Sequence, residues 1–373
     1  MVNSNANAIG IIFPNSYDNL VPELAGDRLM ASIPFAGRYR IIDFLLSSLA
    51  NCGISNIAIV VRENYHSLMD HLGSGRAWDL LRKNGGLSIF PPYAEKNMKV
   101  YSGRVEALES ILPYLKSKKE KYVIMMDANI AVDFDFNAML AEHIESGADV
   151  TVAYTEQEIP AELIRAGSHG DMYYTLKLDD GRVRRIFMNS EMCGKQNLSM
   201  NIYIMDREAL IDKIHAAFVR GSSCFERDIL APRLEKYNIR GYKYDGYYAR
   251  ICGLKSYFDE NMKLLDDENL DALFTGGQIY TKIRDDNPTR YINGCKTKNN
   301  LVADGCVIEG DVENCVLFRG VKIAKGAKIR NSVLMQDTVV NAGARLDYVV
   351  TDKNVTIEVG QELKGTDTQP FYV

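Results

Sequence analysis

Two hydrophobic patterns alternate along the first 270 residues. Short runs of consecutive apolar residues, such as those at 9–13, 56–61 and 122–127, are separated by stretches in which apolar residues recur every three or four positions. The first pattern is typical of strands buried on both faces, and the second of amphipathic helices. Strands that alternate with helices predict a parallel sheet covered by helices on both sides.

Individual elements can be predicted within this region. The apolar residues of 103–118 fall on one helical face and predict a single helix, whereas 136–154 predicts a helix, a turn at Gly147 and a strand. Asp-Gly pairs at 180–181 and 245–246 stand between strand-like runs. Such pairs favour tight turns, so each predicts a β-hairpin added to the sheet.

From about residue 299 the hydrophobic period changes to six. One column of apolar residues is followed, four positions later each time, by a second column of aliphatic or small residues. The first contains Leu317, Ile323, Ile329 and Met335, and the second Val321, Ala327, Val333 and Val339. This pattern is typical of a left-handed parallel β-helix with three six-residue repeats per coil. We therefore expect an α/β domain over 1–270, a linker over 271–298 and a β-helix over 299–373.

Composition narrows the class of protein. The chain has 373 residues, 46% of them hydrophobic, which suits a globular protein of two domains. Its net charge of −5 argues against general binding to nucleic acid or to an anionic membrane. No apolar run approaches the ~20 residues that span a bilayer, and the first residues do not form a secretory signal. The seven cysteines include no CxxC pair, so we expect reduced thiols and a cytoplasmic location.

One block of sequence closely resembles a known enzyme family. The stretch "IPFAGRYRIIDFLLSSLANCGISNIAIVV" at 33–61 is similar to the sugar-nucleotide pyrophosphorylases, specifically bacterial glucose-1-phosphate adenylyltransferase (ADP-glucose pyrophosphorylase). The segments 84–93, 198–206 and 253–266 resemble further blocks of that family. The resemblance implies a Rossmann-like nucleotidyltransferase domain with a mixed, mostly parallel sheet, joined to a hexapeptide β-helix. It also implies chemistry on glucose 1-phosphate, ATP and Mg²⁺.

The phosphate-binding loop of the family is not preserved. Its glycine-rich sequence corresponds here to "NSYDNLV" at 15–21, which contains no glycine. Pro14 has no N–H to offer a phosphate, and Asp18 places a negative charge where phosphates would lie. The family's arginine falls near Leu20. We therefore expect this loop to repel a nucleoside triphosphate.

Three further positions depart from the catalytic pattern. Met30 stands where the resemblance implies a phosphate-facing lysine, and a thioether cannot make a charge-assisted hydrogen bond. An ungapped alignment puts Asn129 and Ile251 at the two metal-binding aspartates, and isoleucine cannot bind a metal. Asp127 would take the metal role only if the register slipped by two residues. We expect no catalytic residue, metal ligand or cofactor in this chain, with Mg²⁺ bound by a catalytic partner.

Ligand sites are implied at five other positions. Gly103, Glu106 and Asn201 are candidates for a residual sugar-phosphate pocket, the first two in "GRVEA", which corresponds to "GTADA" in the family. Arg38 and Arg40 match basic positions near which some members bind phosphorylated effectors. Ordinary surface or intradomain ion pairs are the alternative explanation for these two arginines.

The resemblance extends to a particular kind of subunit. Within the family, D-type subunits lack the catalytic loop, assemble with an active partner and set its response to metabolites in glycogen synthesis. This implies a noncatalytic regulatory subunit in a hetero-oligomer, a heterotetramer, with a catalytic ADP-glucose pyrophosphorylase subunit. Two alternatives stay open: an active nucleotidyltransferase that uses Asp127 and Arg28, and a stand-alone sugar-phosphate sensor. A hexapeptide acyltransferase is disfavoured because 299–373 contains no histidine to act as a base.

Overall fold

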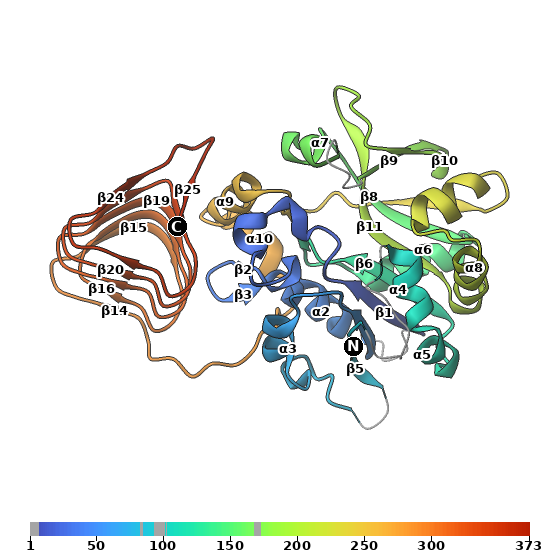
Figure 1. The fold of residues 1–373 in the computed structure, drawn as a ribbon, viewed down its shortest axis with the longest axis horizontal. Helices are drawn as coiled ribbons and strands as arrows, with labels where there is room; N and C mark the ends of the chain where they lie inside the picture. Colours follow the sequence, from blue (N-terminus) through green and yellow to red (C-terminus); the bar gives the residue numbers. More distant parts are fainter. Residues whose placement is uncertain (1–6, 83–84, 93–100, 102, 168–172) are drawn as a thin grey trace.

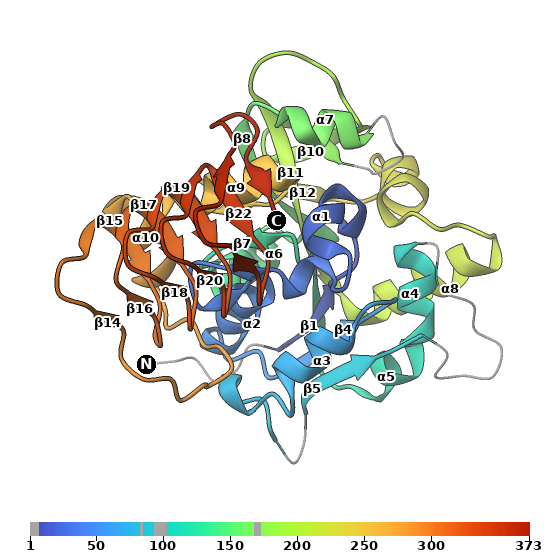
Figure 2. The same cartoon turned by 60° about the vertical axis from the view of Figure 1, so that its left-hand side comes forward.

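A sheet domain and a β-helix lie side by side in the structure (Figure 1). The computed structural model describes residues 7–82, 85–92, 101, 103–167 and 173–373. Figure 2 shows the stacked coils of the β-helix turned toward the viewer, with the sheet domain behind them. None of the helices in the described part of the chain is long and apolar enough to cross a membrane.

The sheet domain is built on nine strands in the order β5-β4-β1-β6-β11-β8-β12-β10-β9. Their bounds are β1 Ala8–Phe13, β4 Asn56–Val60, β5 Gly86–Phe90, β6 Tyr122–Asp127, β8 Val150–Gln157, β9 Tyr174–Asp179, β10 Arg182–Met188, β11 Gln196–Asp206 and β12 Ile239–Lys243. Strands β5, β4, β1 and β6 are parallel, and so are β8 and β12. The remaining pairs, including both neighbours of β11, are antiparallel, so the sheet is mixed rather than mostly parallel.

Helices cover both faces of this sheet, as predicted. Side chains alternate along a strand, so Ile9 and Ile11 of β1 contact one layer of helices and Ile12 the other. The first layer contains α4 Arg104–Ser110, α5 Leu112–Ser117 and α8 Arg207–Val219. The second contains α2 Ile41–Asn51, α3 His66–Leu72 and α6 Phe136–Glu145. The other helices are α1 Pro22–Ala25, α7 Ala161–Gly167, α9 Leu254–Lys263 and α10 Asp267–Phe274.

Two local predictions are wrong. The single helix expected over 103–118 is broken into α4 and α5 at Ile111, because Pro113 cannot donate a backbone hydrogen bond within a continuous helix. The Asp-Gly pair at 180–181 does join β9 to β10. The pair at 245–246 makes no hairpin, because neither residue has the positive φ that the tight turn requires. The strand after it, β13 (Ala249–Arg250), pairs instead with β7 (Ile130–Ala131).

The predicted β-helix is confirmed. Its strands are β14 Arg290–Tyr291, β15 Lys296–Val302, β16 Val307–Ile308, β17 Asp311–Leu317, β18 Lys322–Ile323, β19 Lys328–Leu334, β20 Val339–Val340, β21 Arg345–Asp347, β22 Val349–Thr351, β23 Thr356–Ile357, β24 Glu362–Lys364 and β25 Phe371–Tyr372. All pair in parallel. The first strand, β14, begins inside the segment 271–298 that was expected to be a linker.

The coils are shorter than the expected three repeats of six. Lys296 pairs with Asp311, which pairs with Lys328, so successive coils repeat after 15 and then 17 residues. One corner of each of the first three coils is an asparagine with positive φ, at Asn299, Asn314 and Asn331. Asparagine tolerates this left-handed conformation, which turns the chain sharply and closes the coil with fewer residues. The amides stack along the β-helix, with N–O distances of 2.9 and 3.3 Å.

The two domains share an apolar core. Side chains of the first domain, among them Phe35, Tyr257 and Phe258, pack against Phe318 and Met335 of the β-helix. The contacting elements include α9 and the short hairpin of β2 (Pro34–Phe35) and β3 (Tyr39–Arg40). This continuous packing fixes the β-helix against the sheet domain.

Candidate functional site

A cavity of about 330 Å³ opens at the carboxyl ends of β1 and β6. This edge of a parallel sheet is where α/β proteins commonly bind ligands. The lining includes Ser16, Tyr17, Arg62, Gly103, Arg104, Asp127, Ser223, Cys224 and Glu226. It therefore contains both acidic and basic side chains.

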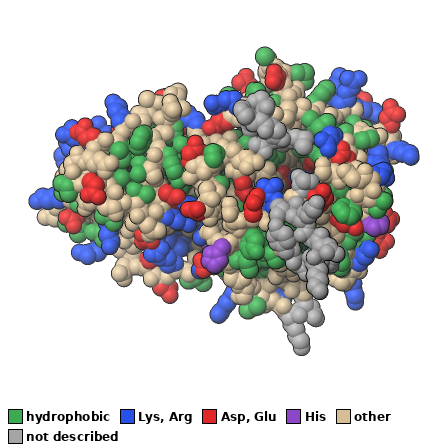
Figure 3. Space-filling view, viewed as in Figure 1, with side chains coloured by type: hydrophobic (Ala, Val, Ile, Leu, Met, Phe, Trp, Pro, Cys, Tyr) green, Lys and Arg blue, Asp and Glu red, His purple; other side chains and the backbone are tan. Residues whose placement is uncertain are grey.

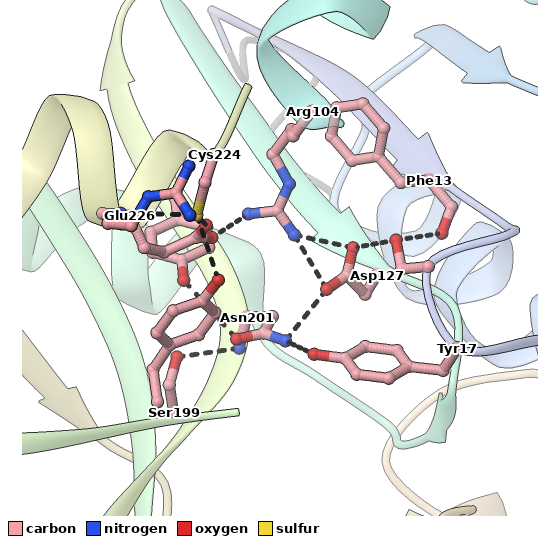
Figure 4. A network of polar contacts seen from close by, with 12 residues as sticks. Phe13, Tyr17, Arg104, Asp127, Ser199, Asn201, Cys224 and Glu226 are labelled. Atoms are coloured by element: carbon pink, nitrogen blue, oxygen red, sulfur yellow. Dashed lines mark hydrogen bonds and ion pairs between the residues drawn. The ribbon is translucent and has the colours of Figure 1, made fainter. Parts of the chain in front are cut away.

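Asp127 is the centre of a hydrogen-bond network in this cavity (Figure 4). It ends β6, and only 1% of its surface is exposed. Its carboxylate accepts hydrogen bonds from Ser16 Oγ at 2.7 Å, from Asn201 Nδ2 at 2.9 Å and from Arg104 Nη2 at 2.7 and 2.8 Å. Both carboxylate oxygens are thus engaged by the protein's own donors.

Arg104 supplies the positive charge of the network. It is the first residue of α4, and its side chain, 11% exposed, pairs with Asp127 and Glu226. The guanidinium also lies over the rings of Phe13 and Tyr203, 5.1 and 5.3 Å from their centroids. Burial opposes the charged form, but the two carboxylates outweigh it and raise the pKa of Arg104 well above its ordinary value.

The segment that corresponds to the phosphate loop is tied down by its own side chains. Asp18 accepts hydrogen bonds from the Met30 N–H and from Asn15 Nδ2, both at 2.7 Å, and it does not line the cavity. The expectation that Asp18 would face a phosphate is therefore wrong, because its carboxylate caps neighbouring backbone instead. Tyr17 takes the inward position, and its hydroxyl contacts Asn201. Burial raises the pKa of Tyr17, so its phenol is neutral.

Met30, Asn129 and Ile251, the three positions predicted to be degenerate, all lie outside the cavity lining. Met30 and Ile251 belong to the apolar core shared with the β-helix. Asn129 is buried, and its backbone carbonyl oxygen accepts a hydrogen bond from the Ile251 N–H at 2.9 Å, so these two residues are neighbours. The fold implies Mg²⁺, but this apolar surrounding does not fit a divalent ion, and the Asp127 oxygens are already engaged. No three acidic, histidine or cysteine side chains converge on a metal site in the described part of the chain.

The predicted pocket residues are only partly brought together. Gly103 lines the cavity, and a Cβ there would lie 2.4 Å from the Ser223 carbonyl oxygen, so only glycine fits. Asn201 contacts Asp127, whereas the half-buried Glu106 does not line the cavity. Neither Arg104 nor Glu226 was predicted from the sequence. Arg104 had a signal, because it replaces the threonine of "GTADA"; Glu226 begins a short π-helical turn that no pattern predicts.

A second recess lies between the two domains. This cleft, of about 280 Å³, is lined by six cationic side chains: Arg38, Arg40, Lys282, Arg284, Arg319 and Lys353. Its acidic lining residues are Asp70 and Asp337. Figure 3 shows Lys and Arg side chains gathered where the β-helix meets the sheet domain. The cleft therefore has an excess of positive charge.

Several of these cations lack a full set of partners. Arg319 is 6% exposed, and its Nε has no hydrogen-bond partner among the described residues. Lys353 has no ion pair there either; burial and the nearby Arg40 and Arg28 lower its pKa to about 7. Arg38 is 44% exposed on its side chain and lies 3.9 Å from Asp304. Arg40 is anchored by hydrogen bonds of 2.7 and 3.0 Å to Ser67, and Lys282 by hydrogen bonds of 2.9 and 3.0 Å to Asp70.

Arg28 does not reach the first cavity. Its Nη2 pairs with both carboxylate oxygens of Asp352 in the β-helix, at 2.5 and 2.7 Å. Arg28 thus joins the two domains. Because it lies outside the cavity, it cannot act together with Asp127 as a substitute for the missing catalytic cation.

The fold and the cavity at its strand ends define a nucleotidyltransferase domain followed by hexapeptide coils. Residues 24–265 match the family model for nucleotidyl transferase, and residues 285–370 match the C-terminal hexapeptide region of GlmU-like proteins. The first match spans well over half of the chain, so this protein belongs to the nucleotidyl transferase family.

Two relatives place it more closely within that family. The chain is 33% identical to glycogen biosynthesis protein GlgD of Bacillus subtilis (strain 168), over 98% of this chain and 95% of that protein. It is 32% identical to glucose-1-phosphate adenylyltransferase of Bacillus mycoides (strain KBAB4), over 88% of this chain and 87% of that enzyme. The resemblance to this group of the family is thus confirmed along nearly the whole chain.

Proposed function

We propose that this chain is a catalytically inactive subunit that assembles with an active glucose-1-phosphate adenylyltransferase and modulates ADP-glucose synthesis for glycogen. The observation that carries the proposal is the pairing of Asp127 with Arg104. The carboxylate of Asp127, at the end of β6, is bound by a guanidinium instead of being free for a metal ion. Similarity to GlgD and to the adenylyltransferases supports the pathway.

Physical chemistry favours inactivity. Nucleotidyl transfer depends on positioning phosphates and on neutralising the charge that develops on them. Loss of one preorganised donor typically costs about 10²–10³ in rate. Here Met30 and Ile251 offer no charge, and the segment 15–21 has no glycine-rich cradle. Because these losses concern one coordinated step, we expect a rate near background.

We propose further that the cationic cleft binds a phosphorylated effector. Arginine and lysine side chains suit phosphate. The buried Arg319 lines the cleft, and its Nε has no acceptor in the part of the chain that the structure describes. Arg38 and Arg40 come from the sheet domain, and Arg319 and Lys353 from the β-helix. A phosphate held between them would connect both domains, which is a route for an effector to influence a partner subunit.

Co-expression with a catalytic adenylyltransferase subunit tests the proposed assembly. We expect the two chains to elute together and the partner's turnover or effector response to change when this chain is present, with Mg²⁺ bound by the partner. Separate elution with identical kinetics would contradict the regulatory role. The control is the same complex in which the catalytic subunit carries a substitution of its metal-binding aspartate. Any adenylyltransferase activity that remains in that complex belongs to the present chain.

Two alternatives predict different outcomes. An active nucleotidyltransferase would release pyrophosphate from ATP and glucose 1-phosphate when this chain is purified alone with Mg²⁺. A stand-alone sugar-phosphate sensor would bind glucose 1-phosphate but elute without the catalytic subunit. The position of Arg28 against Asp352 weighs against the first alternative, because the cation that it needs is outside the cavity.

A further inference from the structure

We infer that the Arg104 guanidinium is a built-in cation that takes the place of a divalent metal ion in the cavity, so that the cavity excludes such ions. The inference rests on the proposed function, because it concerns a cavity that no longer performs metal-dependent transfer. It deepens that proposal by stating which cation the cavity uses.

The first argument is the balance of charge. Asp127 and Glu226 are both almost fully buried, and each needs a nearby positive charge. Arg104 meets both with separate nitrogen atoms, Nη2 toward Asp127 and Nη1 toward Glu226. A divalent ion beside the same two carboxylates would add positive charge to a cluster that Arg104 already stabilises.

The second argument is the saturation of Asp127. A divalent ion such as Mg²⁺ or Mn²⁺ requires free oxygen lone pairs. Asp127 already accepts from Ser16, Asn201 and Arg104, so coordination would have to break several charge-assisted hydrogen bonds in a buried site.

The third argument is that Arg104 is held in place. Its side chain packs against Phe13 and Tyr203, and it starts α4 directly after Gly103, where the Ser223 carbonyl leaves no room for a larger residue. Two rings and two carboxylates therefore hold the guanidinium where it stands, and an incoming ion would have to break all of these contacts to displace it.

The test is binding of Mn²⁺ to the full chain, measured by titration calorimetry and by the shift in thermal midpoint. We expect no site in wild type and none in Arg104→Lys, which keeps a cation. Arg104→Gln and Arg104→Thr should each gain a Mn²⁺ site, with an association constant at least tenfold above the detection limit that applies to wild type, and be stabilised by the ion. The double substitution Arg104→Gln/Asp127→Asn should lose this binding.

Two results would overturn the inference. One is Mn²⁺ binding to wild type that Asp127→Asn removes. The other is a lack of Mn²⁺ response in both Arg104→Gln and Arg104→Thr, including failure to fold at millimolar Mn²⁺. Neither result bears on co-elution with a catalytic subunit, and pyrophosphate release by the isolated chain would instead contradict the proposed function.

Discussion

The two recesses of this protein treat charge in opposite ways. In the cavity at the strand ends, Arg104 is paired with two buried carboxylates and surrounded by rings. In the cleft between the domains, cations outnumber acids, and Arg319 and Lys353 lack ion pairs within the described residues. In the first recess the charges are paired within the protein, whereas the second has an excess of positive charge that can attract an anion.

The difference shows that one fold can pair its charges internally in one recess and leave them without partners in another. Charges that the protein pairs internally stabilise its fold, whereas charges left without partners are available to a ligand. Arginine therefore has a structural role in the first recess, whereas the arginines of the second would bind the proposed effector. Four substitutions can break or sharpen this contrast.

The largest effect is expected for Arg104→Ala. Removing the guanidinium leaves Asp127 and Glu226 buried without a positive partner, which should lower the free energy of unfolding by about 3–5 kcal/mol. Urea denaturation would measure the loss. Arg227→Ala is the control, because Arg227 is about half exposed and its ion pair, with Asp228, lies at the surface. If Arg104→Ala loses less than about 1 kcal/mol, its two ion pairs contribute no more than exposed ones, and the contrast between the two recesses fails.

A smaller loss is expected for Arg28→Ala. Its partner Asp352 is partly exposed and keeps a hydrogen bond from Tyr372 at 3.0 Å, so the variant should lose about 2–3 kcal/mol in the same assay. The exposed Arg330 beside Glu313 is a matched control, with about 0.5 kcal/mol or less expected for Arg330→Ala. Equal losses of unfolding free energy in the two variants would show that burial between the domains does not strengthen the Arg28–Asp352 pair.

The cleft should bind anions in a pH-dependent way through Lys353. Burial lowers the pKa of Lys353 most, the positive charges of Arg40 and Arg28 lower it further, and Asp352 and Asp70 oppose them, which gives a pKa of about 7. Lys353 is therefore charged below pH 7 and loses its charge above it. Affinity for sulfate, which does not titrate in this range, should fall about tenfold between pH 6 and pH 9. Calorimetry should show no such slope in Lys353→Met, and an unchanged slope there would assign the effect to another group.

The smallest effect is expected for Arg38→Ala. Because Arg38 is exposed and only 3.9 Å from Asp304, its removal should change the free energy of unfolding by less than about 0.5 kcal/mol. Sulfate affinity at pH 7 should nevertheless fall by about two- to fivefold. A variant with unchanged sulfate affinity would restrict the binding groups of the cleft to its buried cations.

The hydrophobic pattern predicted the architecture well because period alone decides which face of an element is buried. Leu317, Ile323 and Ile329 are buried inside the β-helix, as their spacing requires. Met335 is an exception: Leu334 pairs with Leu317 and takes the inward position, so Met335 packs against the first domain instead. Asp180-Gly181 was recognised as a hairpin because φ there is set by local preference. The same reasoning failed at Asp245-Gly246, where pairing of β13 with β7 prevails over the local turn signal.

The candidate site was harder to predict because its chemistry depends on long-range contacts. In the sequence, Arg104 is separated from Asp127 by 23 positions and from Glu226 by 122 positions. No local pattern joins them. The role of Asp18 could not be predicted for a related reason. In sequence, a carboxylate that accepts a hydrogen bond from the Met30 N–H cannot be distinguished from one that faces a ligand.

The asparagine stack of the β-helix limits how this domain can change in length. Asn299, Asn314 and Asn331 donate from one coil to the next, and Asn331 continues the column to Asp347 at 3.0 Å. A single inserted or deleted residue would move one amide out of the column and shift every inward side chain beyond it. Gain or loss of whole turns is therefore the natural unit by which such a domain can diverge.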